Sequence, residues 1–190
     1  MISDKMVYRP HPYIPDELKD IVFPKDEDND QEKRFKVGMY GGKFMPFHKG
    51  HAHCIDVASS ECDILYVAIF YTHVDEIRYR DKGLAYNVRI TRLNDYLMRK
   101  KDNIKLILVC SHEFSENGVE DWMAEAKYIQ DIIGTKIDAV YSSEPSYDSF
   151  FKKAYPEAIH RLVDPERKEV PISGTKIRSM TKEEARKWIM

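Results

Sequence analysis

The stretch GGKFMPFHKGH, residues 41–51, decides the fold because it joins a strand-like segment to a helix-like one. Phe35–Tyr40 before it predicts a strand that ends at the two glycines, and Gly50–Ser59 after it predicts a helix. Glycines allow a ligand to approach the backbone, and a new helix directs N–H groups and a positive dipole end at the same place. The stretch therefore predicts a phosphate site in a strand–loop–helix unit.

Strand-like and helix-like segments alternate along the rest of the chain. Further strands are predicted at Cys62–Tyr71, Ile104–Cys110, Ala139–Tyr141 and His160–Val163. Further helices are predicted at Asn87–Lys100, Asp121–Ile133, Tyr147–Ala154 and Thr181–Ile189. Because helices of this length connect parallel strands as crossovers, we expect an α/β fold with a Rossmann-like parallel sheet flanked by helices. Ligands bind such sheets at the carboxyl ends of the strands.

Residues 1–34 differ in composition from the remainder. They carry Pro10, Pro12, Pro15 and Pro24, followed by a charged run over residues 25–34. This composition favours an N-terminal extension or linker over residues 1–34 and one domain over residues 35–190.

Composition excludes several classes of function. The 30 Lys and Arg residues nearly balance the 32 Asp and Glu residues, unlike the basic excess of a general nucleic-acid binder. Cys54, Cys62 and Cys110 match no zinc or redox spacing, which favours reduced thiols in a cytoplasmic protein. No apolar stretch follows the first residues, so we expect no signal peptide, and no apolar run reaches the ~20 residues of a membrane helix. We expect neither a nucleic-acid nor a membrane partner, and a homo-oligomer is compatible with the sequence.

His48 and His51 flank Gly50 at the predicted start of the first helix. From there each imidazole can donate a hydrogen bond to a phosphate oxygen. Paired histidines also bind metals, but no third ligand stands at suitable spacing and His53 would point away on a helix, so we expect no metal held by the protein. A Gly-Gly pair alone would indicate only a turn.

A second phosphate motif lies far downstream, at SGTKIR, residues 173–178. Ser173 is suited to cap a helix and Gly174 permits close backbone approach. Lys176 and Arg178 add positive charge beside the first N–H groups of that helix. Taken alone, the segment is equally compatible with an ordinary capped helix.

Together the two motifs resemble the signatures of the HxGH nucleotidyltransferase superfamily. His48 and His51 match the HxGH signature, and the ISxTxxR signature is matched by Ser173, Thr175 and Arg178. The superfamily includes nicotinamide and nicotinate mononucleotide adenylyltransferases, pantetheine-phosphate adenylyltransferase and small cytidylyltransferases. The resemblance implies that both histidines contact triphosphate oxygens and stabilise the charge that develops at the α-phosphate.

Other segments resemble the adenylyltransferase domain of NadR-type bifunctional enzymes, over about Val37 to Trp188. They are Asn87–Leu93, Tyr141–Pro145 and Leu162–Arg167. The resemblance implies adenylyl transfer from ATP to nicotinamide mononucleotide, which gives NAD and pyrophosphate. It also implies Mg²⁺ bound mainly through the ATP phosphates. No GxxxxGK[ST] string is present, so we expect the kinase domain of such enzymes to be missing.

The resemblance supplies a set of candidate site residues. The residues expected to act in catalysis are His48, His51, Lys43 and Arg178. The expected ATP contacts are Gly41, Gly42, Phe44, His48, Gly50, His51, Ser142, Ser143, Glu144, Ser173, Thr175 and Arg178. The expected mononucleotide contacts are Tyr40, Lys43, Trp122 and Arg89. Among them Trp122 is expected to stack on the electron-poor nicotinamide ring.

Several of these residues also have plainer interpretations. Trp122 would be an ordinary core or surface residue, and Arg89 and Arg92 would be solvated helical side chains. Asp164 either orients Arg167 or the loop before the second motif, or simply begins a turn. Two other functions stay open: transfer to or from another substrate, such as pantetheine phosphate or CTP, and a non-catalytic nucleotide or NAD sensor. The preference between amide and acid mononucleotides also stays open.

Overall fold

A sheet of parallel strands forms the centre of the molecule. The computed structural model describes residues 7–8, 33–79, 84–100, 103–116 and 119–190. Within these ranges the main sheet has the order β1-β4-β3-β2-β7-β8. Its strands are β1 (Val7–Tyr8), β2 (Phe35–Gly42), β3 (Cys62–Tyr71), β4 (Ile104–Cys110), β7 (Ala139–Ser142) and β8 (Ile159–Leu162). All of them run parallel except β1, which is antiparallel to β4 at the edge.

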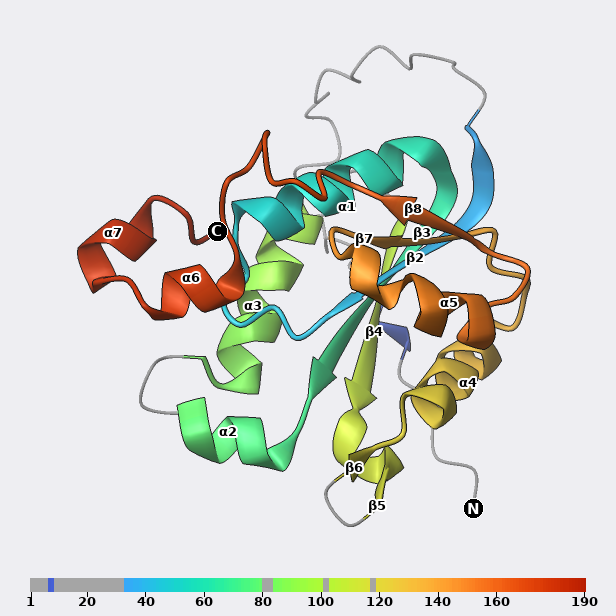
Figure 1. The fold of residues 1–190 in the computed structure, drawn as a ribbon, viewed down its shortest axis with the longest axis horizontal. Helices are drawn as coiled ribbons and strands as arrows, with labels where there is room; N and C mark the ends of the chain where they lie inside the picture. Colours follow the sequence, from blue (N-terminus) through green and yellow to red (C-terminus); the bar gives the residue numbers. More distant parts are fainter. Residues whose placement is uncertain (1–6, 9–32, 80–83, 101–102, 117–118) are drawn as a thin grey trace, which may run out of the picture.

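Helices cover both faces of this sheet (Figure 1). They are α1 (Lys49–Glu61), α2 (His73–Tyr79), α3 (Tyr86–Leu97), α4 (Trp122–Ile133), α5 (Asp148–Ala154), α6 (Gly174–Arg178) and α7 (Lys182–Arg186). Two 3₁₀ turns, η3 (Ser111–Phe114) and η4 (Pro145–Tyr147), and a small hairpin of β5 (Ser115–Glu116) and β6 (Val119–Glu120) complete the described elements. Helices α1 and α3 pack on one face, and α4 and α5 on the other. The predicted Rossmann-like α/β fold is confirmed.

Burial on both faces explains the continuous apolar sequence of the central strand β3. Leu65, Val67 and Ile69 pack with the helices α1 and α3, whereas Tyr66 and Ala68 pack with α4. Successive side chains of a strand point to opposite faces, so a strand covered on both sides must be apolar at nearly every position. None of the helices in the described ranges is long and apolar enough to cross a membrane.

One short piece of the predicted N-terminal extension belongs to the sheet. Val7 and Tyr8 pair with Ile107 and Leu106 of β4. Residues 1–6 and 9–32 lie outside the described residues. The domain boundary at residue 34 therefore stays a prediction.

The end of the chain differs from the prediction. A helix was expected over Thr181–Ile189, but α7 covers only Lys182–Arg186, closed at its start by a capping box between Thr181 and Glu184. The residues after α7 return to the loop before α1, where Ile189 forms a β-bridge with His48. The N–H groups of Trp188 and Ile189 still donate to Ala185 O, but Met190 N donates to Phe47 O, so the chain leaves the helix to pair with that loop. Helix α2 (His73–Tyr79) was not predicted at all.

Candidate functional site

Two adjoining cavities lie at the carboxyl ends of the strands. The first, here called the polar cavity, has a volume of about 380 Å³ and is lined by Tyr40, Gly41, Gly42, Lys43, Phe44, Met45, His48, Gly50, His51, Ser142, Ser143, Glu144, Tyr147, Arg167, Ser173, Gly174, Thr175 and Arg178. The second, here called the aromatic cavity, has a volume of about 170 Å³ and is lined by Met39, Gly41, Gly42, Lys43, Phe70, Ser111, Trp122, Glu125, Ala126, Ile129, Tyr147, Phe150, Phe151 and Tyr155. Gly41–Lys43 and Tyr147 belong to both walls. A ligand that fills both cavities would therefore pass over the end of β2.

The end of β2 is shaped by close packing. A side chain at Gly41 would bring its Cβ within 2.7 Å of the Phe70 ring, so a larger residue here would have to displace that ring. Phe44, at φ 49°, turns the chain out of the strand and is almost completely buried. Its ring contacts the edges of Phe47 and His51, with ring centroids 5.9 and 4.9 Å away. The turn is therefore fixed by an aromatic cluster directly behind the histidines.

His48 caps the helix α1 with its own side chain. Its Nδ1 accepts hydrogen bonds from the backbone N–H groups of Gly50 at 3.1 Å and His51 at 3.4 Å. Because Nδ1 is the acceptor, a neutral imidazole carries its proton on Nε2. His48 Nε2 is buried and has no hydrogen-bond partner among the described residues. The cap therefore leaves one donor for a ligand in the polar cavity.

Gly50 makes room for this cap. A Cβ at position 50 would lie 3.1 Å from two atoms of the His48 ring. A larger residue there would crowd the imidazole against its own hydrogen bonds. The Gly between the two histidines is thus explained by packing within the protein.

His51 stacks on His48, with ring centroids 3.7 Å apart and planes 22° from parallel. Its Nδ1 is buried and likewise finds no partner in the described part of the chain. Burial, and after it the positive charges of Arg167 and Arg178, lower the pKa of His48 to about 4. Burial, followed by His48 and Arg167, lowers the pKa of His51 well below its usual value. At neutral pH both rings are uncharged and act as hydrogen-bonding groups, not as cations.

The first turn of α1 has no free N–H group, so the expectation that its amides bind phosphate is wrong. Lys49 N donates to Trp188 O at 2.9 Å, and Ala52 N donates to His48 O at 3.0 Å. The remaining two amides donate to the His48 ring. Contacts from this motif to a phosphate must therefore come from the imidazoles.

The second motif is attached to the first through Arg178. Ser173 caps α6 as predicted, since its Oγ accepts a hydrogen bond from Lys176 N. Arg178 Nη1 donates to Met45 O at 2.6 Å, and its Nη2 donates to Thr175 Oγ1 at 3.0 Å. A Cβ at Gly174 would lie 3.1 Å from both Arg178 Nη1 and Met45 O. Gly174 therefore permits close contact between the two motifs.

Arg167 is a cation of the polar cavity that the candidate set did not contain. Its guanidinium pairs with the carboxylate of Glu144, and its Nη1 donates to Ile172 O at 2.9 Å. Arg167 also stands at φ 52°, in the left-handed region. The sequence does point to Arg167 as a site residue, because it ends Leu162–Arg167, one of the segments that carry the resemblance.

The loop that presents Arg167 is built on Asp164. The Asp164 carboxylate accepts hydrogen bonds from the backbone N–H groups of Lys168, Glu169 and Val170, at 2.7 to 3.2 Å. These backbone bonds lower the pKa of the Asp164 carboxyl, with that of Val170 contributing most. Of the interpretations that were open, the structure supports the one in which Asp164 orders the loop before Ser173.

Ser142 opens the loop that follows β7, on the other side of the polar cavity. It is buried, and its Oγ lies 2.8 Å from His160 Nε2. His160 Nδ1 lies 3.3 Å from Asp148 Oδ1, so the two side chains beneath Ser142 fix its position. Ser143 and Glu144 continue this wall, as expected for ATP contacts, although the Glu144 carboxylate is already paired with Arg167.

Lys43 stands where the two cavities meet. Its ammonium lies 3.0 Å from the carboxylate of Asp75, which belongs to the unpredicted helix α2. Tyr40, at the same end of β2, is buried, and that burial raises the pKa of its hydroxyl well above the usual range. Both residues line the polar cavity, and their contacts with a substrate stay predictions.

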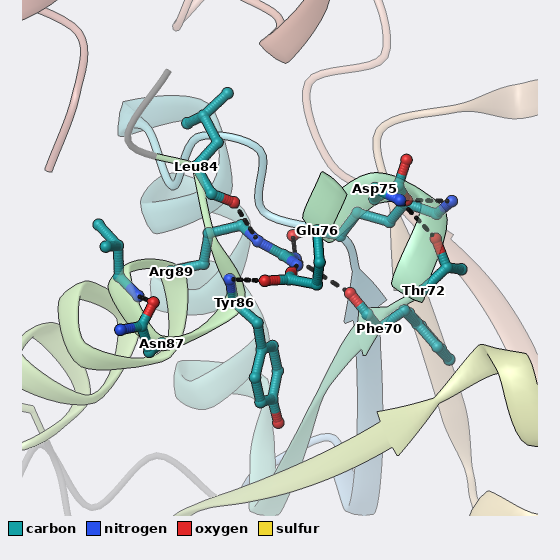
Figure 2. A network of polar contacts seen from close by, with 10 residues as sticks. Phe70, Thr72, Asp75, Glu76, Leu84, Tyr86, Asn87 and Arg89 are labelled. Atoms are coloured by element: carbon teal, nitrogen blue, oxygen red, sulfur yellow. Dashed lines mark hydrogen bonds and ion pairs between the residues drawn. The ribbon is translucent and has the colours of Figure 1, made fainter. Parts of the chain in front are cut away.

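Arg89 is not in contact with either cavity, so the structure contradicts its assignment as a substrate contact. Its side chain is 1% exposed and points between Leu84, Glu76 and Phe70 (Figure 2). Its Nε donates to Leu84 O at 2.9 Å, and its Nη1 donates to Lys43 O at 2.5 Å and Phe70 O at 3.0 Å. Its Nη2 pairs with the Glu76 carboxylate at 2.8 Å. Arg89 is neither a ligand nor a solvated residue, but a buried support for the backbone at Lys43.

Trp122 borders the aromatic cavity as the first residue of α4. Asp121 caps this helix by accepting from the N–H groups of Met123 and Ala124, both at 3.0 Å. The indole is 45% exposed and meets the Tyr147 and Phe150 rings edge to face, at 6.1 and 5.4 Å. The indole thus borders the cavity while it is partly exposed, and its stacking on a ligand stays a prediction.

Comparison with known proteins gives one family and several relatives. The family model described as cytidylyltransferase-like matches residues 39–180. The trifunctional NAD biosynthesis/regulator protein NadR of Salmonella typhimurium is 27% identical over 167 residues, which are 83% of this chain and 38% of NadR. The nicotinamide-nucleotide adenylyltransferase of Methanocorpusculum labreanum is 29% identical over 142 residues, which are 74% of this chain and 76% of that protein. The chain therefore spans well under half the length of the NadR relative.

A solved structure shows the same fold. A crystal structure of a NadR protein in complex with NAD and AMP-PNP superposes with a TM-score of 0.61 and 24% identity, over 83% of this chain and 46% of that one. A NadR protein in complex with NR gives the same TM-score at 23% identity. At these identities the likeness establishes the arrangement of strands and helices.

Proposed function

This chain belongs to the cytidylyltransferase-like family, and we propose on that premise that it transfers the adenylyl group of ATP to nicotinamide mononucleotide. The products would be NAD and pyrophosphate. One observation carries the proposal: two stacked, uncharged histidines present buried nitrogen atoms without partners to a cavity that also holds Arg167 and Arg178. Two such atoms side by side in a cavity wall are explained by a ligand, and the surrounding cations favour an anionic one.

The second cavity supports the choice of acceptor. It is apolar and aromatic, it contacts the polar cavity along Gly41–Lys43, and Trp122 stands at its rim. An apolar cavity of about 150 Å³ in another protein holds one benzene molecule, so about 170 Å³ suits a single aromatic ring. Two relatives, an NAD biosynthesis/regulator protein and a nicotinamide-nucleotide adenylyltransferase, favour a pyridine as that ring.

The reaction needs no nucleophile from the protein. A phosphate oxygen of the mononucleotide attacks the α-phosphorus of ATP and forms a new P–O bond. The bond from the α-phosphorus to the bridging oxygen breaks, and pyrophosphate leaves with that electron pair. Catalysis then consists of holding the two phosphates in line and stabilising the charge on the oxygens.

Each polar side chain has a separate task in this reaction. His48 donates through Nε2–H to an oxygen of the α-phosphate or the bridge, with its orientation fixed by the cap on α1. His51 donates beside it. Arg178 and Arg167 hold the outer phosphates from the second motif and the preceding loop. Lys43, between the two cavities, is placed to contact the phosphate of the mononucleotide.

Magnesium fits this site as part of the ATP complex. The polar cavity offers a single carboxylate, that of Glu144, and Arg167 already pairs with it. Across the described ranges no group of three or more His, Cys, Asp or Glu side chains is arranged to hold a metal ion. The triphosphate oxygens would therefore hold Mg²⁺, which would neutralise part of the charge on the departing pyrophosphate.

Pyrophosphate release from a panel of substrate pairs tests the proposal. ATP and CTP are each combined with nicotinamide mononucleotide, nicotinate mononucleotide, phosphopantetheine and a phosphorylated alcohol. We expect ATP with a pyridine mononucleotide to be the active pair. Release only with CTP, or only with phosphopantetheine, would reassign the substrate within the family. His51→Ala should lower turnover by about 10²-fold, which ties the signal to this site.

A further inference from the structure

The aromatic cavity contains a buried acid, Glu125, that the reaction does not use. Glu125 lies one turn after Trp122 on α4, and the cavity-lining residues of this helix are Trp122, Glu125, Ala126 and Ile129. These positions form the inward stripe of the helix, where apolar residues are expected. Glu125 is only 7% exposed, so an ionisable group interrupts that stripe. A residue that breaks a local rule of this kind often marks a functional position.

The charge of Glu125 affects another residue of the cavity wall. Tyr155, which lines the same cavity, has its pKa raised first by burial and then by Glu125. The other polar groups of the wall are those of Lys43 and Ser111, the hydroxyls of Tyr147 and Tyr155 and the indole N–H of Trp122; the remaining lining residues are glycines and apolar side chains. In such surroundings an acid interacts strongly with whatever polar substituent a bound ring carries.

We propose that Glu125 selects a mononucleotide whose pyridine ring carries an uncharged carboxamide over one whose ring carries a carboxylate. The inference rests on the proposed function and specifies its acceptor. A ring stacked on Trp122 places its substituent within the wall formed by the next turn of α4. A carboxamide N–H can donate to the Glu125 carboxylate, whereas a nicotinate carboxylate would bring a second negative charge beside it.

Lys43 is the cation that lines this cavity, and its charge would favour the acid instead. Its ammonium is 3.0 Å from the Asp75 carboxylate, which already opposes its charge. It also borders the polar cavity, where the phosphates of either mononucleotide would compete for it. Lys43 therefore attracts both substrates through the phosphate that they share, and it discriminates between them less than Glu125 does.

The test compares kcat/KM for nicotinamide and nicotinate mononucleotide, each with saturating ATP, in the wild-type protein and in Glu125→Gln. The wild-type protein should prefer the amide by at least about tenfold, the scale of one hydrogen bond to a charged group. In Glu125→Gln the ratio should fall by about tenfold, mainly because the acid becomes a better substrate. Asp131→Asn removes a charge from the exposed side of the same helix and should leave the ratio unchanged.

Three outcomes would overturn the inference. The first is a wild-type protein that prefers nicotinate mononucleotide. This measurement needs no variant, so it decides the matter even if Glu125→Gln fails to fold. A folded Glu125→Gln protein with the wild-type ratio would show that Glu125 is structural. If the wild-type protein converts neither mononucleotide, the proposed function fails, and the inference fails with it; this pattern differs from an altered ratio between two active substrates.

Discussion

Replacing His48 separates two tasks that one side chain performs, and the structure gives a magnitude for each. In His48→Ala, the amides of Gly50 and His51 lose their acceptor, which costs about 1–2 kcal/mol of stability for a lost helix cap. The same change removes the Nε2–H donor, and loss of one transition-state donor lowers kcat by about 10²–10³-fold.

His48→Asn should divide these effects. Asn is among the best capping residues, so its Oδ1 can accept from the amides of α1 and keep most of the stability. Its side chain is too short to extend a donor to the place of Nε2, so turnover should fall as far as in the Ala variant. Urea unfolding followed by circular dichroism gives the stabilities, and pyrophosphate release gives kcat.

A second histidine of α1 serves as the control. His53 lies outside both cavity walls and pairs with the exposed Glu169 at 3.3 Å. His53→Ala should therefore change kcat by less than about twofold. Wild-type turnover in His48→Asn would show that the Nε2–H donor plays no part in catalysis. Wild-type stability in His48→Ala would show that the cap does not stabilise the fold. Either result would refute the assignment of two tasks to His48.

Three further changes test other parts of the site. Trp122→Ala should raise the KM for the mononucleotide about tenfold and leave that for ATP unchanged; a change confined to ATP would contradict the stacking. Because the folded-state pKa of His48 is depressed to about 4, the folded protein binds fewer protons than the unfolded one between pH 4 and 6.5. His48 therefore contributes about 3 kcal/mol to the free energy of unfolding above pH 6.5, and this contribution is lost as the pH falls towards 4. The kcat should show no titration near pH 6.5. Arg89→Met should cost about 3 kcal/mol in urea unfolding by removing the cation that pairs with Glu76, and adding Glu76→Gln should restore part of it; additive losses would disprove that coupling.

Local sequence was sufficient for the five parallel strands among the described residues and for the helix starts at the two motifs, but not for the edge strand β1. The strands β3 and β4 are apolar runs covered on both faces, so their limits coincide with the predicted Cys62–Tyr71 and Ile104–Cys110. The caps at Asp121 and Ser173 also depend on neighbours within a few residues of the chain. Such features are visible in sequence because the interactions that form them are short in range or repeat along the element.

Helix α2 could not be found in this way because it has no buried face. Its apolar side chains Val74 and Ile77 are 60% and 76% exposed, so no helical period of burial appears in the sequence. The helix is instead held to the site by polar contacts: Asp75 pairs with Lys43, and Glu76 pairs with Arg89 (Figure 2). These partners are distant in sequence, and only the fold brings them together.

The same limit applies to individual residues of the site. Arg89 stands on a helix whose pattern suggested an exposed or ligand-contacting side chain, and four acceptors from other segments instead surround it. Arg167 acquires its place from the loop that Asp164 orders. Glu125 is an ordinary helical glutamate in sequence, and its burial beside Trp122 is visible only in three dimensions.

The most direct test of the central claim is the fate of the α-phosphate of ATP. The protein is incubated with ATP labelled at the α-phosphorus, nicotinamide mononucleotide and Mg²⁺, and the products are separated by chromatography. We predict that the label appears in NAD, that an equal amount of unlabelled pyrophosphate forms, and that His51→Ala forms labelled NAD about 10²-fold more slowly. Tight binding of NAD with no label transferred to it would contradict the account and would leave a protein that senses the nucleotide without making it.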